Sequence, residues 1–425
     1  MAAAQLGDSF SQGFASTGTE VGARGGDPVD LRFYAGISGI YDTGLQPFAV
    51  DAKGNLLAVK GLYGEEASLG AYGIHQWEHS RLGLDYQGIF RHYSSSSYPA
   101  GTNQRLALDY KVQTSKRLFF ETKGTGAILS QGLGGVGGYS IPAYGVVDQP
   151  GVALFDDRVY YGEGSASVTY LVSAHTAFTA EGEGFIARYR ASGLVGMNGF
   201  AARGSLQHRL SRRTTVGAVY ERLNFDYSGV FGQSDINTYE GLFESQLSRR
   251  WTVSLRAGAF QTQVKGLQQV PVDPVITALL GVTTTTATYN AQHFFPVAAA
   301  GLTRKFKRAA LTMSFTQYVT PGNGVYLASR QDSGYAYFNY ESTRKLSVYL
   351  SGGAFSYKSV GQNLQTYTQA SGGAGLTYAI MRSLHLSARY DLRHQDVASL
   401  LYNRTSYSAT LGLTWSPGLY PLRLR

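Results

Sequence analysis

The chain has 425 residues, a formal net charge of +9, 15% charged and 13% aromatic residues, 53 glycines and no cysteine. This length usually means two or three domains, although a large β-barrel folds as one. The aromatic and glycine content is typical of β-structure with many tight turns. A mean hydropathy of −0.15 and the lack of an 18-residue apolar run exclude a transmembrane helix. A membrane barrel remains allowed because only its alternate residues face lipid.

Residues 1–30 are polar, glycine-rich and non-periodic, and are predicted to form a periplasmic tail or a segment that enters a lumen. The first residues, Met1 to Gln5, lack the basic and apolar regions of a signal peptide. An exported chain would therefore be a mature form.

From residue 31 onward, apolar and polar side chains alternate in segments of ten to fifteen residues, which is the pattern of strands with two different faces. Each segment is long enough to cross a bilayer at a tilt. We identify 18 such segments, beginning near residues 31, 65, 81, 103, 118, 158, 176, 197, 214, 236, 251, 296, 309, 334, 346, 367, 384 and 404.

A short basic phrase between the strands sets their period. Leu210–Arg213 and Leu247–Arg250 both read Leu-Ser-Arg-Arg and lie 37 residues apart. Looser copies occur near residues 80, 115, 173, 306, 343 and 381, with spacings of 35 to 38 residues and two of 58. A unit of this size holds two strands, one tight turn and one longer loop, so the repeat predicts a ladder of hairpins.

The predicted fold is all-β: a single antiparallel, up-and-down transmembrane β-barrel of about 18 strands over residues 31–416. Long loops are expected near 131–157 and 265–295, and residues 417–425 are a C-terminal extension. A soluble sandwich or propeller is disfavoured because no single core could bury 18 apolar faces. An adhesive or amyloid-like fibre is the remaining alternative.

The pattern resembles porin-like bacterial outer-membrane β-barrels across residues 31–416 in hairpin period, in alternation and in its aromatic girdles. Short periplasmic turns and long external loops are also what such barrels have. The last strand, Ser408–Trp415, looks like a closing strand read by barrel-assembly machinery, although further residues follow Trp415. The resemblance implies a bacterial outer-membrane location and contact with outer-membrane lipid.

Eighteen strands enclose an aqueous lumen unless something fills it. Alternation predicts a lumen lining with charges of both signs, which suits a channel for polar solutes. The alternative is that these charges only pair with one another and solvate the inner wall. The predicted pore-lining residues are Asp85, Arg91, Arg105, Asp109, Lys111, Glu121, Lys123, Glu181, Glu183, Arg203, Glu221, Glu240, Glu244, Arg256, Arg389 and Asp391.

Two insertions are candidates to narrow the lumen. Residues 131–157 are rich in glycine, and residues 261–295 are nearly uncharged. The second insertion includes a short helix predicted from Asp273 to Gly281, with Asp273 as N-cap and Pro274 in the first turn. We expect it to fold into the mouth as a constriction; contact with a partner or a surface saccharide is the alternative.

The sequence predicts neither an enzyme nor a bound cofactor or metal. Gly132-x-Gly134-x-x-Gly137 matches the dinucleotide fingerprint by letter, but the residues that follow, up to Pro142, cannot open the required helix. Asp391 and His394 are the best candidates for a catalytic base and its orienting partner, yet alternation places them on opposite faces of a strand.

The basic turns are predicted to form a cationic collar at the periplasmic rim. Anionic headgroups attract such residues, and an acidic periplasmic partner is the sharper interpretation. Nucleic acid is not expected as a partner, because a ring of turns makes no groove-shaped patch. The predicted collar consists of Arg81, Lys116, Arg117, Arg212, Arg213, Arg249, Arg250, Lys307, Arg308, Arg344, Lys345 and Arg382.

Five tyrosines between residues 335 and 357 suit either stacking against sugar rings or a membrane girdle. They are Tyr335, Tyr337, Tyr340, Tyr349 and Tyr357. The expected function is a porin-like channel that passes polar solutes, foremost saccharides. The alternatives are an exopolysaccharide-export barrel working with a periplasmic export protein, and a non-conducting adhesin or scaffold.

Overall fold

The computed structural model describes residues 32–43, 61–94, 101–130, 158–190, 195–228, 232–271, 284–320, 329–360, 366–397 and 402–416. The predicted N-terminal tail, the glycine-rich insertion 131–157 with its fingerprint glycines, the helix expected at Asp273–Gly281 and the extension 417–425 lie outside these ranges. Within them, no helix has the length and hydropathy needed to cross a membrane.

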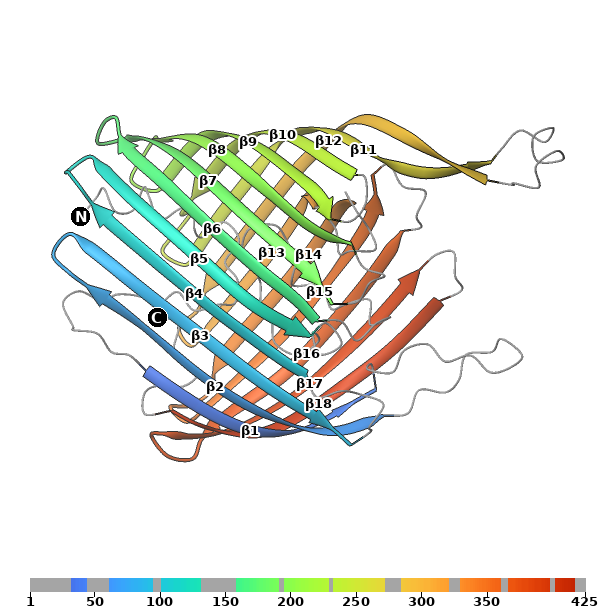
Figure 1. The fold of residues 1–425 in the computed structure, drawn as a ribbon. Coiled ribbons are helices and arrows are strands. Elements are labelled where there is room, and N and C mark those ends of the chain that lie inside the picture. Colours follow the sequence, from blue (N-terminus) through green and yellow to red (C-terminus); the bar gives the residue numbers. More distant parts are fainter. Residues whose placement is uncertain are drawn as a thin grey trace.

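Eighteen strands form one sheet in which every strand pairs antiparallel with its sequence neighbours. The first and last strands also pair, from Ala35↔Trp415 to Asp42↔Ser408, so the sheet closes on itself (Figure 1). The predicted 18-stranded antiparallel barrel is confirmed. The strands are β1 (Arg32–Asp42), β2 (Leu62–Gln76), β3 (Ser80–Tyr93), β4 (Gly101–Gln113), β5 (Leu118–Ser130), β6 (Arg158–Leu171), β7 (Thr176–Tyr189), β8 (Gly196–Arg209), β9 (Thr214–Ser228), β10 (Gly232–Ser245), β11 (Trp251–Pro271), β12 (Thr284–Lys305), β13 (Ala309–Thr320), β14 (Ser329–Glu341), β15 (Leu346–Ser359), β16 (Tyr367–Ala379), β17 (Leu384–Val397) and β18 (Tyr402–Trp415).

Several of the basic turns owe their shape to a serine or threonine that precedes the cations. In the turn between β8 and β9, the Ser211 hydroxyl accepts hydrogen bonds from the backbone N–H groups of Arg213 and Thr214, each at 3.1 Å. Ser115 and Thr343 accept the equivalent pairs of bonds in their own turns. A side chain that satisfies turn N–H groups in this way favours the turn over an extended strand. The repeated phrase is therefore a turn-forming motif.

The two faces of each strand differ as the alternation predicts. On β7, Phe178 is 45% exposed while the neighbouring Ala177 is buried. Every strand from β1 to β18 carries large exposed apolar side chains on its outward face in the described ranges. An apolar surface of this extent is incompatible with water and marks the part of the wall that meets lipid.

The longest hairpin corrects one prediction. Residues 265–271 and 284–295, expected to belong to an uncharged loop, are strand residues of β11 and β12, paired from Lys265↔Asn290 to Pro271↔Thr284. Figure 1 shows this hairpin projecting beyond the ends of the neighbouring strands instead of folding across the mouth. The run of threonines from residue 284 has high β propensity, which favours strands over a loop. The absence of charged residues could not reveal this, because it is compatible with a buried loop and with an exposed hairpin.

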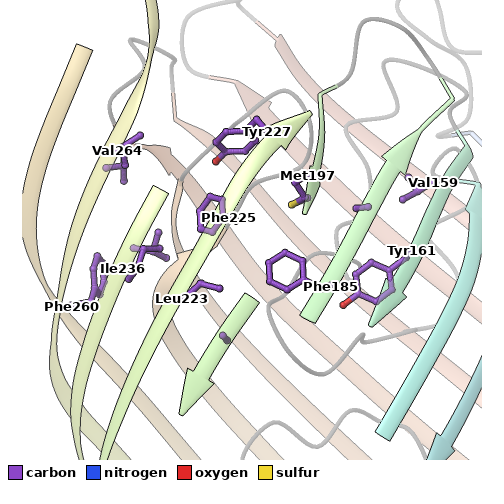
Figure 2. Packing of buried hydrophobic residues seen from close by; sticks show 14 of the residues in the cluster. Val159, Tyr161, Phe185, Met197, Leu223, Phe225, Tyr227, Ile236, Phe260 and Val264 are labelled. Carbon is purple, nitrogen blue, oxygen red and sulfur yellow. The ribbon is translucent and has the colours of Figure 1, made fainter. Parts of the chain in front are cut away.

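The end of the barrel opposite the basic turns is here termed the loop end. Its inner face is apolar and its outer face is polar, the opposite of the rest of the wall. On β6 to β12 the inner face carries a buried apolar cluster that includes Phe185, Met197, Phe225 and Phe260 (Figure 2). The outer face of the same region is polar, and Asn224 donates a 2.6 Å hydrogen bond to Asp235. This part of the wall thus has the two faces of a soluble β-sheet and extends beyond the lipid-facing belt.

Candidate functional site

The sheet register places all sixteen predicted pore-lining residues on the face opposite the exposed apolar side chains. On β7, for example, Glu181 and Glu183 alternate with exposed Phe178 and Ile186. On β17, Arg389 and Asp391 alternate with exposed Tyr390 and Leu392. These sixteen charged side chains therefore share the lumen face of the sheet.

The wall formed by β3, β4 and β5 carries neighbouring charges of opposite sign. Lys123 lies 2.7 Å from Glu121, and Lys111 is 3.9 Å from the same carboxylate. Arg105 lies 3.7 Å from Asp85 on the adjacent strand. Because these pairs stand within one face of the sheet, they hold one another in fixed positions on the lumen wall.

A second charged group lies on β7, β8 and β9. The register places Glu181 opposite Arg203 and Arg203 opposite Glu221. The Arg203 guanidinium contacts both carboxylates, at 3.2 Å from Glu181 and 2.6 Å from Glu221. One cation thus links two acids on either side of it. This group therefore holds two carboxylates for one guanidinium.

Aromatic rings, glycines and an ion pair form a third group on β14 to β17. Tyr335, Tyr337 and Tyr349 face the lumen, and the rings of Tyr337 and Tyr349 are stacked with centroids 6.0 Å apart. Arg389 and Asp391 lie beside them at 2.6 Å from each other. We call these five residues the tyrosine platform.

Glycine makes room for the platform. A Cβ atom at Gly375 would overlap the ring of Tyr349, which lies over this position on the neighbouring strand. The same relation holds between Gly70 and the ring of Tyr34. The tyrosine ring therefore lies flat along the wall, with its broad face available to the lumen, instead of extending across it.

The five tyrosines of residues 335–357 divide between the two faces. Tyr335, Tyr337, Tyr349 and Tyr357 share the lumen parity, whereas Tyr340 is on the lipid-facing side. Asp391 and His394 lie on opposite faces of β17, and His394 contacts the Thr405 hydroxyl at 2.9 Å. In the described ranges, no three His, Cys, Asp or Glu side chains are arranged to hold a metal ion.

The structure changes one member of the predicted collar. Arg81 is a strand residue whose guanidinium contacts Asp109 on the lumen face at 3.0 Å, because it follows the turn instead of standing in it. The other eleven collar residues are exposed, within or beside the turns. Sequence reasoning also missed several lumen acids, among them Glu66, which pairs with Arg91, and Glu163, which accepts a 2.6 Å hydrogen bond from Tyr161. Applying the same alternation to β2 and β6 would have found both.

A closed antiparallel sheet that is apolar outside and charged inside defines a transmembrane β-barrel of the porin type, the architecture of bacterial outer-membrane proteins. No family model and no curated protein matches the sequence.

Among solved structures, the chain is similar to a BenF-like porin from Pseudomonas fluorescens Pf-5, at 10% identity and a TM-score of 0.44, over 92% of this chain and 99% of the porin. It is also similar to the outer membrane protein OpdK from Pseudomonas aeruginosa, at 11% identity and a TM-score of 0.43, over 91% and 98% of the two chains. A third similar structure is OccAB3 from Acinetobacter baumannii, at 7% identity and a TM-score of 0.40, over 91% of this chain and 99% of OccAB3. Likeness this distant carries no conclusion about the solute, and the class rests on the geometry of the barrel itself.

Proposed function

We propose that this barrel is a passive channel, not an enzyme, that it passes polar solutes across the outer membrane, and that saccharides are its preferred class. The tyrosine platform is the observation that supports the saccharide preference. Its stacked Tyr337 and Tyr349 rings face the lumen beside the ion pair of Arg389 and Asp391.

The chemistry of a sugar matches the two parts of this platform. The C–H faces of a pyranose ring pack against an aromatic face, which is apolar in its body and polar at its hydroxyl tip. Charged groups next to the rings form the stronger kind of hydrogen bond with sugar hydroxyls. A weak series of such contacts lets a solute enter and still leave, as conduction requires.

The experiment is single-channel recording in planar bilayers with linear oligosaccharides added. The wild-type protein should show open steps that oligosaccharides block. The Tyr337→Ala/Tyr349→Ala variant should keep the open steps and lose about tenfold in blocking affinity, since two aromatic contacts of ~0.5–1.5 kcal/mol each are removed. Tyr340→Ala, on the lipid side of β14, is the matched control, and oligosaccharides should block it with wild-type affinity. Equal blocking by all three proteins would refute the saccharide preference.

A second candidate is an export barrel that docks a periplasmic protein. The exposed cations of the collar favour it, because the turns at Arg212–Arg213 and Arg249–Arg250 offer four guanidiniums on neighbouring hairpins. Exchanging these four residues for alanine should leave conductance near wild type and abolish co-purification of an acidic partner. Unchanged co-purification would exclude docking at the collar. A membrane that stays silent with folded wild-type protein would instead favour a non-conducting adhesin or scaffold.

A further inference from the structure

The charges on the lumen wall are unevenly distributed around the barrel. In the described part of β6 to β11, the lumen face carries six carboxylates but only three guanidiniums, those of Arg203, Arg256 and Arg209, the last of these next to the turn. We call the six carboxylates the acidic wall. They are Glu163, Glu181, Glu183, Glu221, Glu240 and Glu244.

One member of the acidic wall points to a ligand. Glu183 is only 8% exposed, and its Oε1 atom has no hydrogen-bond partner among the described residues. Glu163, Glu181 and Glu221 are within electrostatic reach and are acids like Glu183, and Arg203 is within reach with the opposite charge. A carboxylate held away from water among other acids is costly unless a cation comes to it.

From these observations we infer that the channel prefers cations and that its preferred saccharides are amino sugars, which carry a protonated amine. This inference rests on the proposed function and names its substrate class more closely. A lumen lined by carboxylates within low-dielectric walls concentrates cations and repels anions. The part of the chain that the structure describes offers no three ligands that converge as a metal site would. The arrangement suits a single ammonium group on a larger molecule.

The position of the acidic wall relative to the tyrosine platform supports an amino sugar over a simple amine. In the ring order of the sheet, eight strands lie between β7 and β16 in either direction, so they stand on opposite sides of the lumen. The acidic wall is centred on β6 to β10 and the platform on β14 to β17. The lumen therefore offers aromatic rings on one side and carboxylates on the other, and an amino sugar carries a group for each.

The level of Glu183 along the barrel adds a second reason for selectivity there. On β7 it directly precedes Gly184 and Phe185, and Phe185 belongs to the apolar cluster of the loop end (Figure 2). The register places Glu183 opposite Ala201, which lies in the same cluster. The carboxylate therefore stands where the charged lumen meets an apolar lining, and an apolar lining strengthens the interaction of a passing cation with it.

The test is the zero-current potential of the purified full chain in a planar bilayer under a gradient of glucosamine hydrochloride. We expect glucosamine to permeate about tenfold better than chloride in the wild-type protein, because focused charge raises local cation concentration by at least this factor. The Glu183→Gln/Glu240→Gln/Glu244→Gln variant should approach a ratio of ~1–2. Glu65→Gln, whose side chain is on the outer face of β2, is the matched control and should keep the wild-type ratio.

A second measurement on the wild-type protein alone keeps the inference testable if the triple variant does not fold. Raising the salt from about 0.1 M to about 1 M shortens the screening length from ~10 Å to ~3 Å, so the preference for glucosamine should fall severalfold. A wild-type ratio near 1 or below it at low salt, or a ratio that the triple variant leaves unchanged, would overturn the inference. In both cases open steps and oligosaccharide block would still support a saccharide channel, whereas a protein without open steps would refute the proposed function itself.

Discussion

The side chains of the lumen show what alternation can and cannot predict. Parity predicts that Glu183 and Arg389 face away from the exposed apolar side chains, because a strand turns each successive side chain to the other face. Parity could not find the relation between Tyr349 and Gly375, since it depends on which residue of the neighbouring strand lies opposite. Cross-strand register is set by turn and loop lengths together, and the sequence shows it only where both ends of a hairpin are recognisable.

The Gly375→Ala variant tests the seating of the platform. The new methyl group would displace the Tyr349 ring, which is a flexible side chain, so the barrel should fold while the ring leaves the wall. We expect oligosaccharide blocking affinity to fall about two- to twelvefold, the equivalent of ~0.5–1.5 kcal/mol for one aromatic contact. Gly182→Ala on the outer face, where a Cβ meets no atom within 4 Å, is the control. If oligosaccharides block the Gly375→Ala channel with wild-type affinity, Tyr349 does not bind the sugar.

At the scale of the strand, the turn motif determined how well boundaries could be predicted. The strands predicted to follow basic turns at residues 176, 214, 251, 309, 346 and 384 begin at those residues. At the loop end the errors grow, and β12 begins at Thr284 instead of near residue 296. A turn with a capping hydroxyl stops a strand at a definite residue, whereas a polar, β-prone loop carries no equivalent stop signal.

Ser211→Ala tests the hydroxyl as the turn-forming element. It removes two hydrogen bonds to the backbone N–H groups of Arg213 and Thr214. We expect a loss of about 1 kcal/mol in the free energy of unfolding and slower folding into lipid vesicles, by analogy with helix caps that satisfy backbone N–H groups in the same way. Urea titration followed by tryptophan fluorescence measures both. Ser211→Thr should retain most of the stability, and an equal loss in both variants would point to packing instead of the hydroxyl.

Considered as a whole, the molecule combines a closed wall with one hairpin that leaves it. β10 pairs with β11 only as far as Gly232↔Gly266, and β12 pairs with β13 only from Ala298 onward. Beyond these positions, β11 and β12 have only each other as partners in the described ranges. Two strands alone contribute little stability, so the wall does not depend on the hairpin tip.

Replacing residues 268–287 by Asn-Gly distinguishes a hairpin that projects from the barrel from a segment that folds into its mouth. Leu267 and Thr288 are directly paired, and Asn-Gly closes a two-residue hairpin between such positions. A projecting hairpin predicts that single-channel conductance and thermal stability both stay near wild type, because the closed ring of pairings from β1 to β18 is intact. A segment folded into the mouth would predict a clear rise in conductance when it is removed. Bilayer recording on the shortened chain, with heat-dependent gel mobility as the check on folding, decides between them.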